Sequence, residues 1–125
     1  MIKKIKILIV EDEIITAKSL KRDLEAFGYE ILKPIPKGED AVPVAIRENP
    51  NLILMDIRLA GGLDGIEAAE RIILKKNIPI VFMTGYTTEE IKERASKVNP
   101  IDYLEKPVDI NKVQQIIDTI KAGVS

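Results

Sequence analysis

Apolar and polar segments alternate along the chain in a pattern that predicts five strands, each followed by a helix. Short apolar runs rich in β-branched residues predict strands at Ile5–Val10, Tyr29–Lys33, Leu52–Met55, Ile78–Met83 and Ile101–Leu104. Apolar residues at helical spacing predict helices over 14–27, Glu39–Glu48, Gly65–Lys76, Glu89–Lys97 and a last one after Asp109. No linker, low-complexity stretch or internal repeat interrupts this order.

Helix ends are marked by residues with known capping preferences. Gly28 stands where the first helix should end, and Asp109 precedes the last helix as an N-cap. Thr87 or Thr88 should cap the fourth helix, with Glu90 as a capping-box partner of Thr87. Pro43 is tolerated if Asp40 is the N-cap of the second helix, and should distort that helix if it begins earlier.

Strands that alternate with helices indicate an α/β domain, a parallel sheet covered by helices on both faces. A doubly wound sheet is favoured over a closed barrel, which needs more strand–helix units than this chain has. In such sheets, ligands bind beyond the carboxyl ends of the strands. A chain of 125 residues corresponds to one domain of ordinary size.

Composition and charge remove several classes of function. The chain has no cysteine and no histidine, which excludes disulfides, thiolate catalysis, Cys/His zinc sites and a Ser–His–Asp triad. A net charge of −1 with few aromatic residues argues against direct nucleic-acid binding. The apolar runs are far shorter than the about 18–20 residues of a membrane span, so we expect no membrane partner and a cytoplasmic location.

Polar side chains follow the predicted strands and are unusual as a set. They are Glu11, Asp12 and Glu13 after the first strand, Asp56 after the third, Thr84 after the fourth and Lys106 after the fifth. Each alone has a plain structural explanation as a helix-start, turn or surface residue. Together, converging carboxylates call for a hard cation such as Mg²⁺, and a lysine and a hydroxyl beside them would complete a cradle for a phosphoryl group. Asp56, in the middle, is a candidate nucleophile.

The sequence resembles the receiver domains of two-component response regulators from Ile5 to about Lys121. The resemblance rests on Ile-Leu-Ile-Val-Glu-Asp-Glu (7–13), Leu-Ile-Leu-Met-Asp-Ile-Arg-Leu (52–59), Leu-Asp-Gly-Ile-Glu-Ala-Ala (63–69), Pro-Ile-Val-Phe-Met-Thr-Gly-Tyr (79–86) and Asp-Tyr-Leu-Glu-Lys-Pro (102–107). It implies a flavodoxin-like receiver fold of five parallel strands in the order 2-1-3-4-5 with five helices.

The resemblance also implies roles for individual residues. Asp56 corresponds to the phospho-acceptor, Glu11 and Asp12 to the acidic pair that positions Mg²⁺, and the backbone carbonyl of Arg58 to a further metal ligand. Thr84 corresponds to the hydroxyl that binds the aspartyl phosphate, Lys106 to the cation that pairs with it, and Tyr103 to an aromatic switch residue. The Lys106–Pro107 peptide is expected to be cis.

The same resemblance implies partners and limits. The phosphoryl group would come from a histidine kinase or phosphotransfer protein and would switch a surface that binds a downstream protein effector. The chain would not be an enzyme beyond transient aspartyl-phosphate formation and its hydrolysis. We expect residues 1–125 to form a single receiver domain with no output domain. The last helix lacks the arginine of receivers that dimerise through that face, which predicts a monomer or weak dimer.

Two further features depart from the common receiver pattern. The stretch between Asp56 and Asp64-Gly65 is one residue longer than usual and carries Ala60-Gly61-Gly62, and Gly85 replaces a more frequent alanine.

Three other classes of protein share part of this pattern. A haloacid-dehalogenase-type phosphohydrolase would need a second aspartate at the position of Arg58. A flavodoxin-like mononucleotide binder would need a Gly/Ser/Thr-rich loop after the first strand, where this chain has Glu11-Asp12-Glu13. A receiver-like protein that acts by contacts alone would not need the acceptor, the acidic pair, Thr84 and Lys106.

Overall fold

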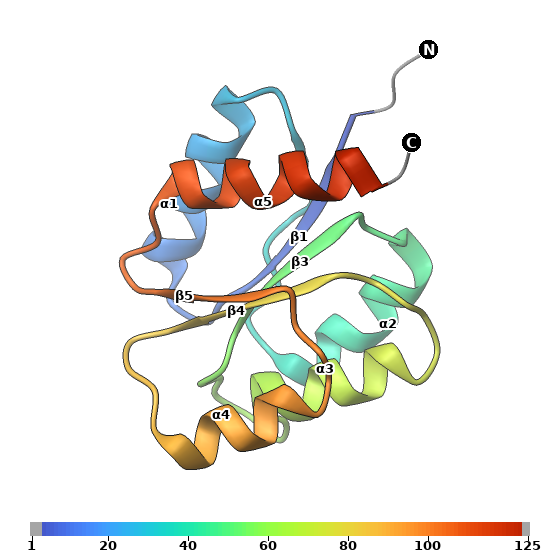
Figure 1. Ribbon diagram of the computed structural model, residues 1–125, viewed down its shortest axis with the longest axis vertical. Coiled ribbons are helices and arrows are strands. Elements are labelled where there is room, and N and C mark those ends of the chain that lie inside the picture. Colours follow the sequence, from blue (N-terminus) through green and yellow to red (C-terminus); the bar gives the residue numbers. More distant parts are fainter. Residues whose placement is uncertain (1–3, 124–125) are drawn as a thin grey trace.

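Five parallel strands form the centre of the molecule. The computed structural model describes residues 4–123 (Figure 1). The strands are β1 (Lys6–Val10), β2 (Glu30–Ile31), β3 (Leu52–Asp56), β4 (Ile80–Thr84) and β5 (Asp102–Glu105). They lie in the order β2-β1-β3-β4-β5, which confirms the doubly wound α/β fold that the sequence predicts.

Helices cover both faces of this sheet. They are α1 (Ile14–Ala26), α2 (Gly38–Glu48), α3 (Gly65–Ile73), α4 (Glu89–Ser96) and α5 (Ile110–Gly123). Helices α1 and α5 lie on one face, and α2, α3 and α4 lie on the other (Figure 1). Within residues 4–123, none of these helices has the length and apolar character needed to cross a membrane.

The central strands are buried on both sides because their apolar side chains alternate between the two layers. In β1, Ile7 and Ile9 pack with α1 and α5, while Leu8 and Val10 pack against the other three helices. All residues of β3 and β4 are buried. Continuous apolar runs of this kind are what a sheet with two covered faces requires.

The strand register brings the polar strand ends to one edge. Val10 is paired with Met55, so the residues that follow this pair, Glu11 and Asp56, lie at the same level of the sheet. Thr84 is paired with Glu105, so Lys106 emerges beside the end of β4. The sheet therefore gathers residues that are far apart in the sequence.

The observed helix ends match most of the predicted caps. Gly28 follows α1 with φ +91° and Thr88 accepts from the amide of Ile91, so Thr88, and not the alternative Thr87, caps α4. Asp109 accepts from the amide of Asn111 at the start of α5. Not every periodic apolar residue is inward, because Ile14 and Phe27 at the two ends of α1 are exposed.

The elements begin and end within two residues of their predicted bounds, except that α3 ends at Ile73 and not at Lys76. Prolines lie in or beside two of the elements. Helix α2 begins at Gly38, before Asp40, yet it continues through Pro43 to Glu48 without interruption. The alternative with Asp40 as N-cap is therefore wrong. Strand β2 has only two residues, and beyond Pro34 the edge continues as an isolated bridge between Ile35 and Val10. Proline has no amide hydrogen to donate, which limits the ladder there.

Gly65, the first residue of α3, lies against the backbone at the end of β3. Its amide donates to the carbonyl of Ile57 at 2.9 Å, and a Cβ added to it would lie 1.9 Å from the carbonyl oxygen of Asp56. Such an overlap with backbone requires that either α3 or the end of β3 move. The missing side chain of Gly65 thus fixes how closely α3 approaches Asp56.

We expect Gly65→Ala to lower the free energy of unfolding by about 3 kcal/mol, at the upper end of the usual cost of overpacking. Gly85→Ala is the matched control, since a Cβ at Gly85 meets nothing within 4 Å. The control should change stability by less than about 1 kcal/mol. Urea denaturation of both variants measures this, and equal stabilities would contradict the close approach of α3.

Candidate functional site

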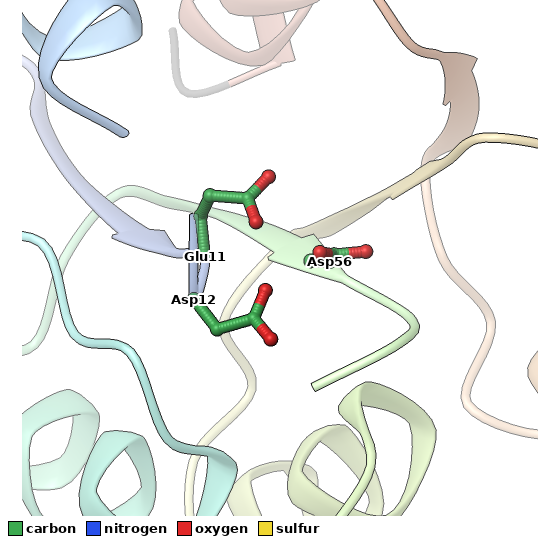
Figure 2. Close-up of side chains that lie close together, drawn as sticks. All are labelled: Glu11, Asp12 and Asp56. Atoms are coloured by element: carbon green, nitrogen blue, oxygen red, sulfur yellow. The ribbon is translucent and has the colours of Figure 1, made fainter. Parts of the chain in front are cut away.

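Three carboxylates meet at the edge of the sheet where β1 and β3 end. Figure 2 shows Glu11 and Asp12, which follow β1, with their side chains turned toward Asp56, the last residue of β3. One oxygen from each lies within 4.8 Å of the others. Glu11 and Asp56 are only 2% and 3% exposed, whereas Asp12 is half-buried. The cluster predicted from the sequence is therefore formed, and it is open to solvent on the side of Asp12.

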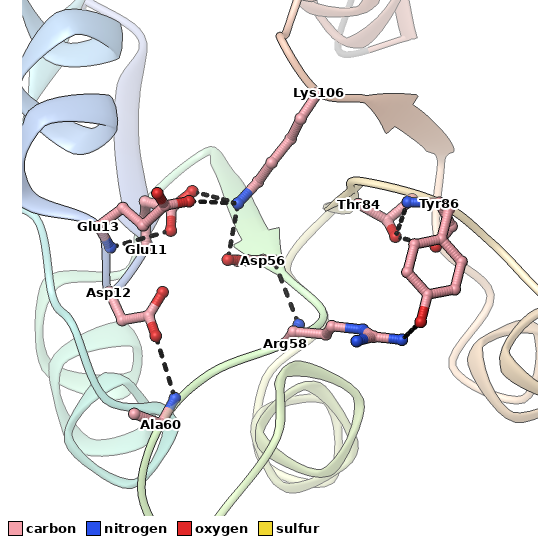
Figure 3. Close-up of polar contacts among 9 residues, drawn as sticks. All are labelled: Glu11, Asp12, Glu13, Asp56, Arg58, Ala60, Thr84, Tyr86 and Lys106. Atoms are coloured by element: carbon pink, nitrogen blue, oxygen red, sulfur yellow. Dashed lines mark hydrogen bonds and ion pairs between the residues drawn. The ribbon is translucent and has the colours of Figure 1, made fainter.

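Lys106 brings a positive charge into this cluster from the neighbouring strand end. Its Nζ donates to Asp56 Oδ2 at 2.8 Å and lies 2.6 Å from Glu11 Oε1 and 3.8 Å from Glu13 Oε1 (Figure 3). The backbone holds the lysine in place, since its amide donates to the carbonyl of Thr84 at 2.8 Å. The following Lys106–Pro107 peptide is cis, as expected.

The ammonium of Lys106 is stabilised by the acids around it. Burial alone would lower its pKa, but the hydrogen bond to Asp56 and the nearby negative charges of Asp56 and Glu11 raise the pKa above its usual value. Lys106 therefore stays protonated at neutral pH and is a permanent cation beside Asp56.

Backbone amides satisfy several of the remaining carboxylate oxygens. Asp56 Oδ1 accepts from the amide of Arg58 at 3.2 Å, and Asp12 Oδ2 accepts from the amide of Ala60 at 3.3 Å (Figure 3). Glu11 Oε2 accepts from the amide of Glu13 at 3.1 Å. The loop after β3 is thus bound directly to two acids of the cluster.

One oxygen of the cluster remains without a hydrogen bond. Glu11 Oε1 is buried and has no hydrogen-bond partner among the described residues, although it forms an ion pair with the Lys106 ammonium at 2.6 Å. Four acids, Glu11, Asp12, Glu13 and Asp56, also outnumber the single ammonium of Lys106, which contacts all of them except Asp12. An all-oxygen donor set with excess negative charge and an unsatisfied buried oxygen fits a hard divalent cation such as Mg²⁺.

Thr84 lies at the site but its hydroxyl is engaged with its own loop. The side chain is 2% exposed, its Oγ1 donates to the carbonyl of Tyr86, and it accepts from the amide of Tyr86 at 3.3 Å. In Figure 3 this hydroxyl is turned toward Tyr86 and away from Asp56. The structure therefore places Thr84 on the strand next to the acceptor, with its hydroxyl bound elsewhere.

The side chain of Arg58 is directed away from the acids. Its guanidinium lies 4.3 Å from the centre of the Tyr86 ring and also donates to the phenolic oxygen of that residue (Figure 3). This contact joins the loop after β3 to the loop after β4. The part of Arg58 that contacts the acidic cluster is its backbone amide, which donates to Asp56 Oδ1.

Tyr103 lies on β5, half-buried, with its ring 6.1 Å from that of Phe82 and tilted by 31°. Burial raises the pKa of its phenol, so the side chain stays neutral. The ring thus packs beside the strand that ends in Thr84, on the layer that contains α4.

Sequence reasoning missed Tyr86 as a site residue. Its two roles, as backbone partner of Thr84 and side-chain partner of Arg58, depend on the shape of the loop after β4. No residue pattern reports that shape. The position directly after Thr84-Gly85 was the available signal.

Comparison with known proteins agrees with this geometry. Residues 7–118 match the response regulator receiver domain family. The transcriptional regulatory protein PdtaR of Mycobacterium tuberculosis is 35% identical over 96% of this chain, which spans 57% of that protein's length.

Two solved receiver domains share the fold. That of a modulated diguanylate cyclase from Desulfovibrio desulfuricans is 39% identical, with a TM-score of 0.88 over 94% of each chain. That of a sensor histidine kinase from Pseudomonas aeruginosa is 30% identical, with a TM-score of 0.82 over 94% of this chain and 97% of its own, and has a magnesium ion coordinated in its active-site cleft. The acidic cluster, Lys106 and the strand order thus occur in a chain that belongs to the receiver domain family of two-component response regulators.

Proposed function

We propose that this chain accepts a phosphoryl group on Asp56 and passes the signal on through a change of surface. The observation that carries the proposal is the setting of Asp56, which ends a buried central strand between the Lys106 ammonium and the acidic pair Glu11 and Asp12. A structural aspartate does not need excess negative charge around it. A phospho-acceptor does, if a divalent cation is to join Lys106 in neutralising the transferring oxygens.

The donor that we propose is a phosphohistidine, and it lies outside residues 1–125 because they contain no histidine. A carboxylate oxygen of Asp56 forms the new bond to phosphorus as the bond from phosphorus to the imidazole nitrogen breaks, and the imidazole takes up a proton. Lys106 remains charged throughout and stabilises the phosphoryl oxygens. A histidine kinase or phosphotransfer protein and a downstream protein effector are thus the partners that we propose.

Glu11, Asp12, Asp56 and the backbone carbonyl of Arg58 are the groups that we propose for Mg²⁺. The donor atoms are all oxygen, and Asp12 leaves the cluster accessible from solvent. When bound, Mg²⁺ supplies a second positive centre for the transferring group. The chain's own residues hold that position open and orient the acceptor through the hydrogen bond from the Arg58 amide.

Thr84 and Tyr103 are the residues that we propose to link phosphorylation of Asp56 to a change of the protein surface. A phosphoryl group on Asp56 offers new acceptor oxygens to the Thr84 hydroxyl, which then leaves the backbone of Tyr86. The loop after β4 moves with it, and the half-buried ring of Tyr103 changes its packing on Phe82. We propose that this alters the surface around α4 and β5, so that the chain acts as a stoichiometric switch and not as a turnover enzyme.

Incubation with acetyl phosphate and Mg²⁺ should add one phosphate to the wild-type chain, and Asp56→Asn should abolish the adduct. An acyl phosphate is labile to base, so alkaline treatment should remove it. Intact mass measures both, with the exposed substitution Asp118→Asn as the matched control. An undiminished adduct in Asp56→Asn would refute the acceptor, and release of many equivalents of phosphate in a short time would indicate a phosphohydrolase instead.

Asp12→Asn should change stability in opposite directions with and without metal. Without Mg²⁺ it removes one repelling charge and should stabilise the fold by about 1 kcal/mol. With Mg²⁺ at about 100 times its Kd, the wild-type chain should gain about 2.7 kcal/mol, and the variant should gain much less because a ligand is missing. Thermal unfolding in EDTA and in MgCl₂ measures the difference. The control Asp23→Asn removes a half-buried carboxylate of α1 that lies outside the acidic cluster, so this variant should respond like wild type. An equal gain in all three proteins would contradict the metal site.

A further inference from the structure

The loop between β3 and α3, residues 57–64, is held by three carboxylates at alternate backbone amides. Asp56 accepts from the amide of Arg58 and Asp12 from that of Ala60 (Figure 3). Further along, Glu39 Oε2 accepts from the amide of Gly62 at 3.1 Å, and its Oε1 makes a longer contact of 3.5 Å to the amide of Leu63. Two of these acids belong to the acidic cluster, and the third comes from the first turn of α2.

The contact between Glu39 and the loop depends on glycines at both ends. Gly38 is buried, and a Cβ there would lie 2.9 Å from the carbonyl oxygen of Leu63, so its lack of a side chain lets α2 begin against the loop. Gly61 has φ +106°, and a Cβ there would lie 3.1 Å from both carboxylate oxygens of Glu39. The backbone on each side is therefore shaped to admit this carboxylate.

Glu39 differs from the other two acids in what else it must do. The oxygens of Asp12 and Asp56 serve the acidic cluster, so a bound cation competes with the amides of Arg58 and Ala60 for them. Glu39 is not part of the cluster and can hold the loop whether or not a cation is present. A loop with two adjacent glycines would otherwise lose considerable conformational entropy each time it ordered.

We propose that Glu39 is a positioning residue, which fixes the loop after β3 so that the backbone of Arg58 is already in place when Mg²⁺ binds. This proposal rests on the proposed function for the role of the Arg58 carbonyl as a ligand. It assigns to Glu39 a part in metal affinity although its side chain lies outside the cluster.

The test compares Glu39→Ala with Glu39→Gln in the full chain. Amide hydrogen exchange and ¹⁵N–¹H spectra report on Gly62, and titration with MgCl₂ in the same spectra and by calorimetry gives the metal Kd. In Glu39→Ala we expect the Gly62 amide to exchange about 10-fold faster. We expect Mg²⁺ to bind about 5- to 10-fold more weakly, near the lower end of the effect of removing an outer-shell partner. Glu39→Gln should restore most of both, because its amide oxygen still accepts from Gly62.

Asp40→Ala is the matched control. Asp40 carries the same charge in the same turn of α2, and its side chain makes no hydrogen bond or ion pair with the residues between 4 and 123. It should retain wild-type exchange at Gly62 and wild-type affinity for Mg²⁺. If Asp40→Ala weakens binding as much as Glu39→Ala does, the charge at the helix start is responsible and the anchor is refuted. Unchanged Gly62 exchange and unchanged Kd in Glu39→Ala would refute it as well.

Phosphorylation by acetyl phosphate separates this proposal from the function on which it rests. At low Mg²⁺, Glu39→Ala should be phosphorylated more slowly than wild type, and at saturating Mg²⁺ the two rates should converge, since the acceptor itself is intact. A rate that stays low at saturating Mg²⁺ would overturn a role in metal affinity. If the wild-type chain takes no phosphate at all while the Gly62 and Kd effects are found, the proposed function fails and the anchor stands.

Discussion

Repulsion between carboxylates at one edge of the sheet is the main electrostatic constraint on this structure. Glu11 and Asp56 are almost fully buried, and Lys106 lies within 2.8 Å of both. A pair of like charges at such positions is costly in a medium of low dielectric, and one ammonium does not balance every acid around it. The fold tolerates the arrangement because strands β1, β3 and β4 are buried in apolar layers on both sides and cannot swing apart.

The two cations near the site have different tasks that suit their chemistry. Lys106 ends in a compact point charge that three carboxylates share, and its backbone is tied to Thr84. Arg58 has a planar guanidinium, which lies over the Tyr86 ring and not beside the acidic cluster. Had Arg58 turned inward, it would have neutralised the cluster and removed the reason for a divalent cation. Its contact with Tyr86 therefore helps to keep the site negative.

The α/β class and the meeting of Glu11, Asp12, Asp56 and Lys106 could be predicted from the apolar pattern and the parallel strands, whereas the strand order was implied only by the resemblance to receiver domains. What could not be predicted depends on loop conformation. The hydroxyl of Thr84 faces Tyr86 only because of the path of the loop after β4. Glu39 looked like an ordinary acid at a helix start, and its contact with Gly62 needs the positive φ of Gly61 and the bare Cα of Gly38. Likewise Pro43, which should have limited α2, is accommodated inside the helix.

The contrast between buried strands and exposed loops also decides which part of the molecule the proposed phosphoryl group on Asp56 could move. Leu54 and Phe82 are fully buried, one in each of the two apolar layers. A strand therefore cannot slide in response to a change at Asp56 without opening the core. The loop after β4 is less constrained than the strands, because Tyr86 is 55% exposed and is held by contacts with Thr84 and Arg58. A new partner for the Thr84 hydroxyl removes one of these restraints at little cost to the core. The ring of Tyr103 packs on Phe82, two residues before Thr84 in β4, and it is only half-buried, so the core does not enclose it completely. Rigid strands that hold the charges and a loop that a single hydroxyl can release are therefore two consequences of one pattern of burial.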